Sequence, residues 1–183
     1  DKMIGIAGAG GLGSNVAVNL VRSGITDIKI ADFDVIEQSN LNRQFYFRDQ
    51  IGQNKVNALY ENLKRINPSL NIKIVHQRLE KNNISNIFAD CHIVVEAFDK
   101  KEYKSILIEE LLSQKKLIVA GSGIAHHDLN NIETRKLRDN LYVVGDFTKG
   151  IDKYKTFSTK VSIVAATMAN IVMDKGGFYE RNE

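Results

Sequence analysis

The chain has 183 residues, of which 43% are hydrophobic and 26% charged, as is typical of one soluble domain with a substantial core over residues 1–183. Its net charge of +3 is spread along the chain, which argues against a nucleic-acid partner, because such partners usually meet a concentrated basic face. No apolar run approaches the roughly 18 residues of a membrane span and no signal peptide is visible, so we expect no membrane partner and a cytoplasmic location.

The N-terminal part predicts a strand–helix–strand unit. Met3–Ala7 is a short apolar run that ends in glycines, as expected of a buried parallel strand. Ser14–Ser23 places apolar residues at helical spacing, and Gly24 is suited to end that helix. Ile28–Ala31 is a second apolar strand, and Asp32 stands at its carboxyl end.

A glycine-rich loop joins the first strand to the helix, which is the context in which such a loop binds phosphate. Gly8 allows a tight turn, and Gly13 allows the helix to pack closely. Gly10 and Gly11 leave room for backbone amides to approach a phosphate at the helix N-terminus. Asp32, about 20 residues further on, is placed to accept hydrogen bonds from a ribose. The alternatives are a glycine-rich turn without a ligand and a capping role for Asp32.

Residues 33–52 form a polar, irregular segment, and a loop of this length inside a domain is usually functional. The side chains of Ser39–Gln44 carry amides, a hydroxyl and a guanidinium, and such a polar set on a long loop indicates ligand binding rather than plain surface. Arg43 can make a two-pronged contact with phosphate oxygens, and Lys55 can place a compact positive charge near the transferred phosphate. These cations suit a triphosphate that is attacked at one phosphorus, and they indicate an ATP-dependent adenylating enzyme. Taken alone, Lys55 would be better explained as an exposed lysine at a helix start, and only its place beside Arg43 and the glycine loop favours phosphate.

The rest of the chain extends the sheet. Asn131–Leu137 and Asn140–Gly145 are joined too closely for a helical crossover, so they predict an antiparallel pair, and the following Asp146–Thr159 is polar and flexible in character. We therefore expect an α/β fold: a Rossmann-like open sheet, parallel in its first part and mixed or antiparallel in its last, with helices on both faces. The other expected elements are helices over Gln53–Ile66, Glu102–Ser113 and Lys160–Met173, and strands over Asn71–Leu79, His92–Phe98 and Lys116–Ala120.

Asp99 stands at the carboxyl end of a buried strand, where the ligand sites of open α/β sheets gather. A carboxylate at this place can hold magnesium between phosphates, because magnesium favours a few carboxylates, waters and phosphate oxygens. The alternative is a cap for the helix that follows.

Other reactive side chains predict structural or surface roles. Cys91, the only cysteine, is expected to be buried and structural rather than nucleophilic, and it excludes an internal disulfide. His126 and His127 would point to opposite sides of a strand, so we expect no metal there. The lysines expected on the solvated surface include Lys100, Lys101 and Lys104.

Four segments together resemble the ThiF/MoeB family of sulfur-carrier-protein adenylyltransferases, which are relatives of the ubiquitin-activating enzymes. They are GAGGLGSN after the first strand, DFDVIEQSNLNRQ after the second, GQNK before the next helix and EAFD at the fourth strand. The resemblance covers about residues 3–173. The short length and the EAFDK form, which departs from the commoner DCTDN, are most similar to the compact thiamine-biosynthesis ThiF proteins.

The resemblance implies ATP and magnesium as cofactors, with Arg43, Lys55 and Asp99 as catalytic residues and Asp99 also associated with magnesium. It implies as partner a small ubiquitin-like sulfur carrier protein with a Gly-Gly tail, whose terminal carboxylate attacks the α-phosphorus of ATP. A homodimer is expected because the family is typically dimeric, and no zinc is expected because the CxxC pairs of many relatives are absent. The residues implied to bind the nucleotide are Gly8, Gly10, Gly11, Gly13, Asp32, Ser39, Asn40, Leu41, Asn42, Arg43 and Lys55.

Three alternatives stay open at this point. A nicotinamide-dependent oxidoreductase would share the glycine loop and Asp32, but it leaves Arg43, Lys55 and Asp99 without a common purpose. A non-catalytic nucleotide- or carrier-binding module would bind the same partners yet release no pyrophosphate. Within the superfamily, the activated carboxylate could belong to a molybdenum-cofactor carrier or to a modified tRNA base.

Overall fold

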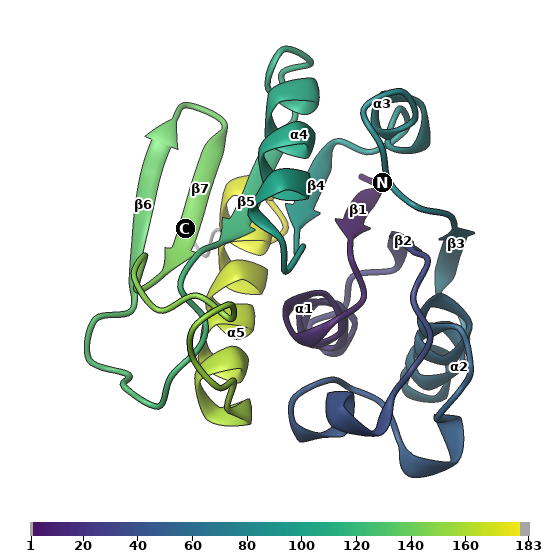
Figure 1. Ribbon diagram of the computed structural model, residues 1–183. Coiled ribbons are helices and arrows are strands. Elements are labelled where there is room, and N and C mark those ends of the chain that lie inside the picture. The colour runs from purple at the N-terminus through teal and green to yellow at the C-terminus, as the bar shows by residue number, and fades with distance from the viewer. Residues whose placement is uncertain (1, 180–183) are drawn as a thin grey trace.

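The computed structural model describes residues 2–179 and contains a seven-stranded sheet in the order β3-β2-β1-β4-β5-β7-β6 (Figure 1). All neighbouring strands pair in parallel except β6, which runs antiparallel to β7 at one edge. The predicted Rossmann-like sheet, parallel first and mixed last, is therefore confirmed. The strands are β1 (Ile4–Ala7), β2 (Asp27–Asp32), β3 (Asn71–His76), β4 (Ile93–Glu96), β5 (Leu117–Gly121), β6 (Glu133–Arg138) and β7 (Leu141–Gly145).

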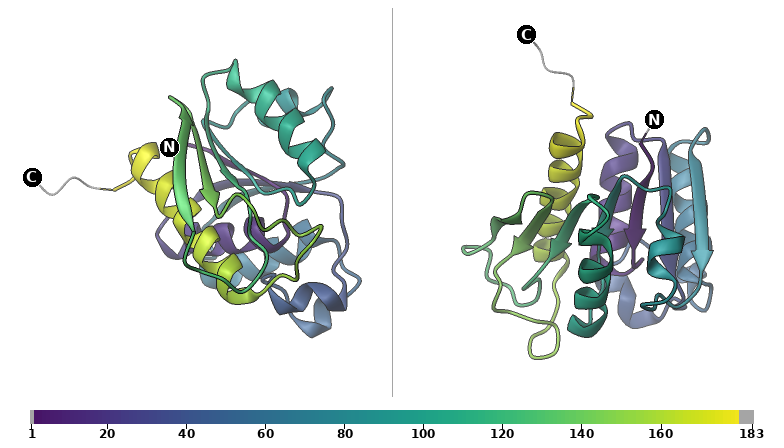
Figure 2. Two further views of the ribbon diagram at one scale, coloured as in Figure 1. Left: turned by 60° about the vertical axis from the view of Figure 1, so that its left-hand side comes forward. Right: turned by 90° about the horizontal axis from the view of Figure 1, so that it is seen from above.

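Helices cover both faces of the sheet and bury two apolar cores (Figure 2). Ile4 and Ile6 of β1 pack beneath α1, α2 and α5, whereas Ala7 and Val94 pack beneath α3 and α4. The central strands are thus buried on both sides, which is why they are continuous apolar runs in the sequence. The helices are α1 (Gly11–Arg22), α2 (Lys55–Ile66), α3 (Ile84–Ile87), α4 (Lys101–Leu112) and α5 (Ser158–Gly176). None of the helices within residues 2–179 has the length and apolar run that crossing a bilayer requires.

Element ends differ from the predictions near the edge of the sheet that carries the site. The helix expected over Ser14–Ser23 already begins at Gly11, so the glycine loop supplies its first turn. The strand expected to reach Leu79 ends at His76, which pairs with Asp32 at the end of β2. The short helix α3 was not predicted, because one buried turn carries no detectable helical period.

The segment 33–52 is more ordered than predicted. It contains two 3-10 helices, η1 (Gln38–Asn42) and η2 (Arg48–Gln50). Side-chain amides stabilise both, since Asn40 Oδ1 accepts a hydrogen bond from the Glu37 amide at 2.8 Å and Gln50 Oε1 accepts one from the Phe47 amide at 3.0 Å. The polar residues of this segment therefore also build its backbone.

Candidate active site

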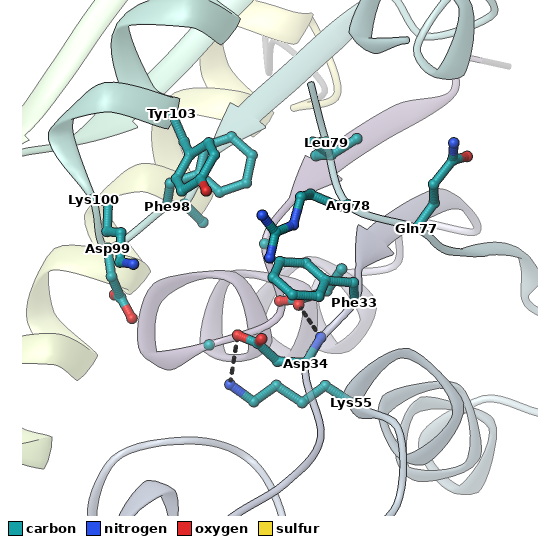
Figure 3. Close-up of a pocket in the computed structure, with 14 residues that line it drawn as sticks. Phe33, Asp34, Lys55, Gln77, Arg78, Leu79, Phe98, Asp99, Lys100 and Tyr103 are labelled. Carbon is teal, nitrogen blue, oxygen red and sulfur yellow. Dashed lines mark hydrogen bonds and ion pairs between the residues drawn. The ribbon is translucent and has the colours of Figure 1, made fainter. Parts of the chain in front are cut away.

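A cavity of about 190 Å³ opens where β1, β2, β3 and β4 end (Figure 3). The carboxyl ends of parallel strands meet at one edge of the sheet, which is where open α/β folds bind ligands. The cavity therefore collects short segments that are far apart in the chain. Its lining residues are Gly8, Gly10, Asp32, Phe33, Asp34, Lys55, Gln77, Arg78, Leu79, Ala97, Phe98, Asp99, Lys100 and Tyr103.

The glycine loop turns between β1 and α1, and its backbone borders the cavity at Gly8 and Gly10. Gly8 has a φ of +102°, which L side chains rarely adopt. A Cβ on Gly13 would lie 1.7 Å from the Gly8 carbonyl oxygen, so the first turn of α1 packs closely only with glycine there. The free amides and positive dipole end of α1 can hold a phosphate at this point.

Asp32 supports the glycine loop from the next strand. Its Oδ2 accepts a hydrogen bond from the Ala9 amide at 2.6 Å, and its Oδ1 accepts one from the Asp34 amide at 2.8 Å. The buried Tyr46 hydroxyl donates to the Ala9 carbonyl oxygen at 2.6 Å. Each carboxylate oxygen of Asp32 keeps a further lone pair, so the residue can support the loop and accept from a ribose as well.

Lys55 is a buried cation in the cavity wall. Only 6% of the residue is exposed, and its Nζ lies 3.8 Å from Asp34 Oδ2. Burial raises the pKa of Asp34, the neighbouring Asp32 charge adds to this, and Lys55 lowers it. The alternative that Lys55 is an exposed lysine at a helix start is therefore wrong. Its ammonium has one partner at the limit of an ion pair, which leaves hydrogen-bond donors for a phosphate.

Arg43 lies beside the glycine loop but outside the lining of this cavity. Its Nη1 donates to Asn42 Oδ1 at 2.8 Å and to the Ser39 carbonyl oxygen at 3.3 Å, so the guanidinium is held within its own turn. Its Nε is 3.6 Å from the position that a Cβ on Gly11 would take. The structure thus places Asp32, Lys55 and Asp99 around one cavity and keeps Arg43 apart from them.

The other residues of the predicted nucleotide wrap also lie outside the lining. Asn40 is buried and caps η1, and Leu41 packs against the core beneath α1 and α2. Asn42 donates from Nδ2 to the Thr156 carbonyl oxygen at 3.4 Å, while Ser39 is exposed. Contacts of these residues with a nucleotide stay a prediction.

Asp99 lies on a turn that an unpredicted buried ion pair supports. Glu96 is fully buried, and its Oε1 accepts a hydrogen bond from the Phe98 amide at 2.7 Å. Lys104 Nζ lies 2.7 Å from Glu96 Oε2 and donates to the Gly121 carbonyl oxygen at 2.6 Å. Burial raises the pKa of Glu96, and Lys104 opposes that shift. The prediction that Lys104 lies on the solvated surface is therefore wrong. The signal available in the sequence was the acid Glu96 at the end of an apolar strand, eight residues before this lysine.

A second cavity of about 430 Å³ adjoins the first at residues 98–100. Its walls come from α4, from the end of β5 and from the connection between β7 and α5. Sequence reasoning did not predict it, since the contributing segments are widely separated. Its lining residues are Leu12, Phe98, Asp99, Lys100, Lys101, Glu102, Lys104, Gly121, Ser122, Gly123, Ile124, Gly150, Ile151 and Asp152.

Arg78 and Phe33 form a further wall of the first cavity that was not predicted. The Arg78 guanidinium carbon lies 4.6 Å from the centroid of the Phe33 ring, and Figure 3 shows the two groups stacked. Arg78 follows β3 and Phe33 follows β2, and these strands end side by side because Asp32 pairs with His76. The neighbouring ends of two parallel strands were the signal for this contact.

Within residues 2–179 no group of three or more His, Cys, Asp or Glu residues could hold a metal. Magnesium needs few protein ligands when phosphates and waters complete its shell. Asp99 lines the cavity beside the phosphate-binding loop, and its Oδ2 lies 4.0 Å from the position of a Cβ on Gly10. This donor set fits magnesium that arrives with a nucleotide.

Cys91 and the two histidines lie away from the cavities. Cys91 is buried, as predicted, and burial raises the pKa of its thiol to about 12, so the reactive thiolate is disfavoured. His126 and His127 lie on a loop with stacked rings, whose centroids are 4.1 Å apart. His126 Nδ1 accepts a hydrogen bond from the Asp128 amide at 3.2 Å.

Comparisons with known proteins agree with this geometry. The family model described as the ThiF family matches residues 1–173. Adenylyltransferase and sulfurtransferase UBA4 of Candida glabrata is 34% identical over 120 residues, which cover 65% of this chain and 28% of that protein. The protein of Gracilaria tenuistipitata named "Probable molybdopterin-synthase adenylyltransferase" is 29% identical over 116 residues, which cover 63% and 33%. The chain therefore spans about a third or less of these curated relatives.

A solved structure supports the fold over nearly the whole chain. Escherichia coli tRNA N6-threonylcarbamoyladenosine dehydratase in complex with ATP superposes with a TM-score of 0.85, covering 98% of this chain and 89% of that one. The sequence identity is 21%, so this likeness shows the shared architecture alone.

Proposed function

The chain belongs to the ThiF family, and we propose that it is an ATP- and magnesium-dependent adenylyltransferase. Its substrate in this proposal is the C-terminal glycine carboxylate of a small ubiquitin-like sulfur carrier protein, and pyrophosphate is released. One observation carries the proposal: a phosphate-binding loop, a ribose-placed acid, a buried cation and Asp99 line one cavity, which joins a second cavity at Asp99. The relatives named adenylyltransferases support the same activity.

The first cavity takes the nucleotide. Backbone amides at Gly10 and the start of α1 receive the phosphates, and Asp32 accepts from the ribose. Lys55 supplies positive charge from the cavity wall. Arg43 lies beside Gly11, and its Nη1 donates to Asn42 and Ser39, so Nε and Nη2 are the donors left for a phosphate.

The second cavity takes the carrier's tail. Its volume of about 430 Å³ leaves room for a narrow Gly-Gly segment, and Gly121, Gly123 and Gly150 form part of its wall. It meets the nucleotide cavity at residues 98–100, which is where the terminal carboxylate must meet the α-phosphorus.

The chemistry needs neither a base nor a covalent enzyme intermediate. The tail carboxylate is already ionised at neutral pH, so its oxygen attacks the α-phosphorus directly. A carboxylate oxygen–phosphorus bond forms, the bond from the α-phosphorus to the bridging oxygen breaks, and pyrophosphate leaves with that electron pair. Magnesium, which Asp99 is placed to hold with the phosphates, supplies neutralising charge. The protein contributes position and fixed charge.

Two carriers are candidates. We rank a ThiS-like carrier of thiamine biosynthesis first, because the EAFDK segment at residues 96–100 resembles that of the compact thiamine-biosynthesis proteins. A molybdenum-cofactor carrier is second, because a relative carries the name molybdopterin-synthase adenylyltransferase.

The test is incubation with ATP, magnesium and each purified Gly-Gly carrier, followed by intact mass measurement. We expect one carrier to gain the mass of AMP and pyrophosphate to appear with it. A carrier that lacks its last two glycines is the matched control. Failure of both carriers to gain AMP would contradict the proposed activity.

A thermal-shift comparison separates this proposal from a nicotinamide-dependent oxidoreductase. A ligand that binds the native state raises the melting temperature, so ATP with magnesium is expected to raise it and NAD is not. Stabilisation by NAD alone would overturn the assignment of the first cavity to ATP.

A further inference from the structure

We propose that Lys100 is a catalytic residue whose ammonium lies between the incoming carboxylate and the α-phosphate. This inference rests on the proposed adenylation and names a cation that serves it. Within the part of the chain that the structure describes, only Phe98, Asp99 and Lys100 line both cavities. The side chains at this junction are one aromatic ring, one carboxylate and one ammonium, so Lys100 is the cation placed where the two substrates meet.

Lys100 is available for this role. It is exposed, and it forms no ion pair within 4.0 Å to any other residue of the described range 2–179. Figure 3 shows Lys100 next to Asp99, on the side of the cavity away from Phe33 and Gln77. Phe33 follows the ribose-placed Asp32, so Lys100 lies toward the end of the cavity that is left for the phosphates.

The backbone of Lys100 is held in place although its side chain is free. It is the N-cap of α4, and its carbonyl oxygen accepts a hydrogen bond from the Lys104 amide at 3.2 Å. Two residues earlier, the Phe98 amide donates a hydrogen bond to Glu96 Oε1, and the ion pair with Lys104 holds the Glu96 carboxylate in place. The backbone at Lys100 is therefore held in place, while its exposed side chain forms no ion pair with the residues that the structure describes.

The other lysines of the two cavities are less suited. Lys55 lines only the nucleotide cavity and faces Asp34. Lys104 lines only the second cavity, and both Glu96 and the Gly121 carbonyl oxygen occupy its ammonium. Lys101 lines only the second cavity. Lys115, which follows α4, is exposed and lines neither cavity, so it serves as the control lysine.

The need for a cation at the junction follows from charge. A carboxylate and an α-phosphate are both anionic, so their approach is unfavourable until positive charge lies beside both. The glycine loop, Lys55 and magnesium neutralise the phosphates of bound ATP, whereas the carboxylate adds its charge only during the reaction. An ammonium that acts on the second charge lowers the barrier without tightening ATP binding.

The experiment compares Lys100→Met with Lys115→Met in carrier-dependent ATP–pyrophosphate exchange, with ATP affinity and melting temperature measured on the same samples. The probe is whichever of the ThiS-like and molybdenum-cofactor carriers the unaltered enzyme adenylates. We expect Lys100→Met to lower kcat about 100-fold, with ATP affinity and melting temperature unchanged. Lys115→Met should retain the full rate. Lys100→Arg, which keeps the charge, should restore at least about a tenth of it.

Each contrary result has a distinct meaning. Loss of less than about tenfold in Lys100→Met, or an equal loss in Lys115→Met, overturns the role of Lys100 while adenylation stands. A parallel loss of ATP affinity also overturns it, because the effect then belongs to nucleotide binding. An unaltered enzyme that adenylates neither carrier overturns the proposed function, and this inference falls with it.

Discussion

The two cavities are held together by different interactions. At the first cavity, Asp32 accepts a hydrogen bond from the glycine loop and Tyr46 donates one to it, and Gly8 and Gly13 pack without space for a methyl group. At the second cavity, the walls come from distant segments, and ion pairs of lysines with the buried Glu96 and Asp146 hold them. We therefore expect added volume to lower stability around the first cavity, and loss of one charge to lower it around the second.

Asp146 and Lys160 form the pair that orders the β7–α5 connection. Both side chains are buried, and Lys160 Nζ also donates to the Ala125 carbonyl oxygen at 2.7 Å. Asp146 Oδ1 accepts hydrogen bonds from the Thr148 and Lys149 amides at 2.8 and 2.7 Å. The turn that precedes Gly150 in the second cavity therefore depends on this one ion pair.

The largest expected effect comes from breaking that pair. Lys160→Met leaves the Asp146 carboxylate buried without its counter-charge, which should lower the free energy of unfolding by about 3–5 kcal/mol in urea denaturation. Lys175→Met removes a lysine from an exposed pair with Asp174 on the same helix and should leave stability unchanged. Equal stability of the two variants would show that charge does not hold the second cavity together.

Loss of Asp99 tests the junction between the two cavities. Asp99→Ala should reduce carrier-dependent ATP–pyrophosphate exchange about 100- to 1,000-fold, as expected when charge stabilisation at a reacting phosphate is lost. The residue is exposed, so the melting temperature should not change. Asp49→Ala alters an exposed acid that lines neither cavity and should retain exchange. Near-normal exchange in Asp99→Ala would exclude the catalytic role of this carboxylate.

Added volume tests the first cavity. The new Cβ of Gly13→Ala would collide with the Gly8 carbonyl oxygen, so we expect a loss of about 1–3 kcal/mol of unfolding free energy. Gly10→Ala meets no atom closer than 3.6 Å and has a φ of −88°, so its stability should match that of the unaltered protein. A Gly13→Ala variant as stable as Gly10→Ala would argue against close packing of the loop.

The smallest expected effect is in the pH dependence of stability. Burial raises the pKa of Asp146, but hydrogen bonds from Lys160 and from two backbone amides outweigh it, so the net pKa lies below the ordinary value of 3.8. A lowered folded-state pKa contributes stability that is fully present above pH 3.8 and is lost as pH falls through the lower value. Melting temperatures from pH 6 downward should therefore fall more steeply for the unaltered protein than for Asp146→Asn. Parallel curves would contradict the lowered pKa.

Most of the fold could be predicted because its signals are local. The apolar runs of β1, β2 and β4, the helical spacing in α2 and the short connection between β6 and β7 lie within single segments. Asp32 and Asp99 could be placed in one site because parallel strands end at the same edge of the sheet. The burial of Lys55 beside Asp34 agrees with a role in the site. It could not be predicted, because the residues next to Lys55 in the chain resemble those of an exposed helix start.

The misplaced residues share a physical reason. Arg43 was expected in the cavity, but the turn of η1 brings Asn42 and a backbone carbonyl within its reach, and both accept hydrogen bonds from Nη1. Lys104 was expected on the surface, but one turn of α4 carries it over Glu96. A long cation takes the nearest acceptor in space, and residue spacing alone does not identify that acceptor.

By itself, the sequence determined the order of the strands' apolar runs, the glycine loop, Asp32 at the end of β2 and Asp99 after β4, because each depends on residues close together in the chain. Only the tertiary structure decided that two cavities meet at residues 98–100, and which lysines are held in ion pairs and which are free. The reason is that a lysine's role depends on which carboxylate lies within a few ångströms of it after folding, and such partners are set by packing between distant segments.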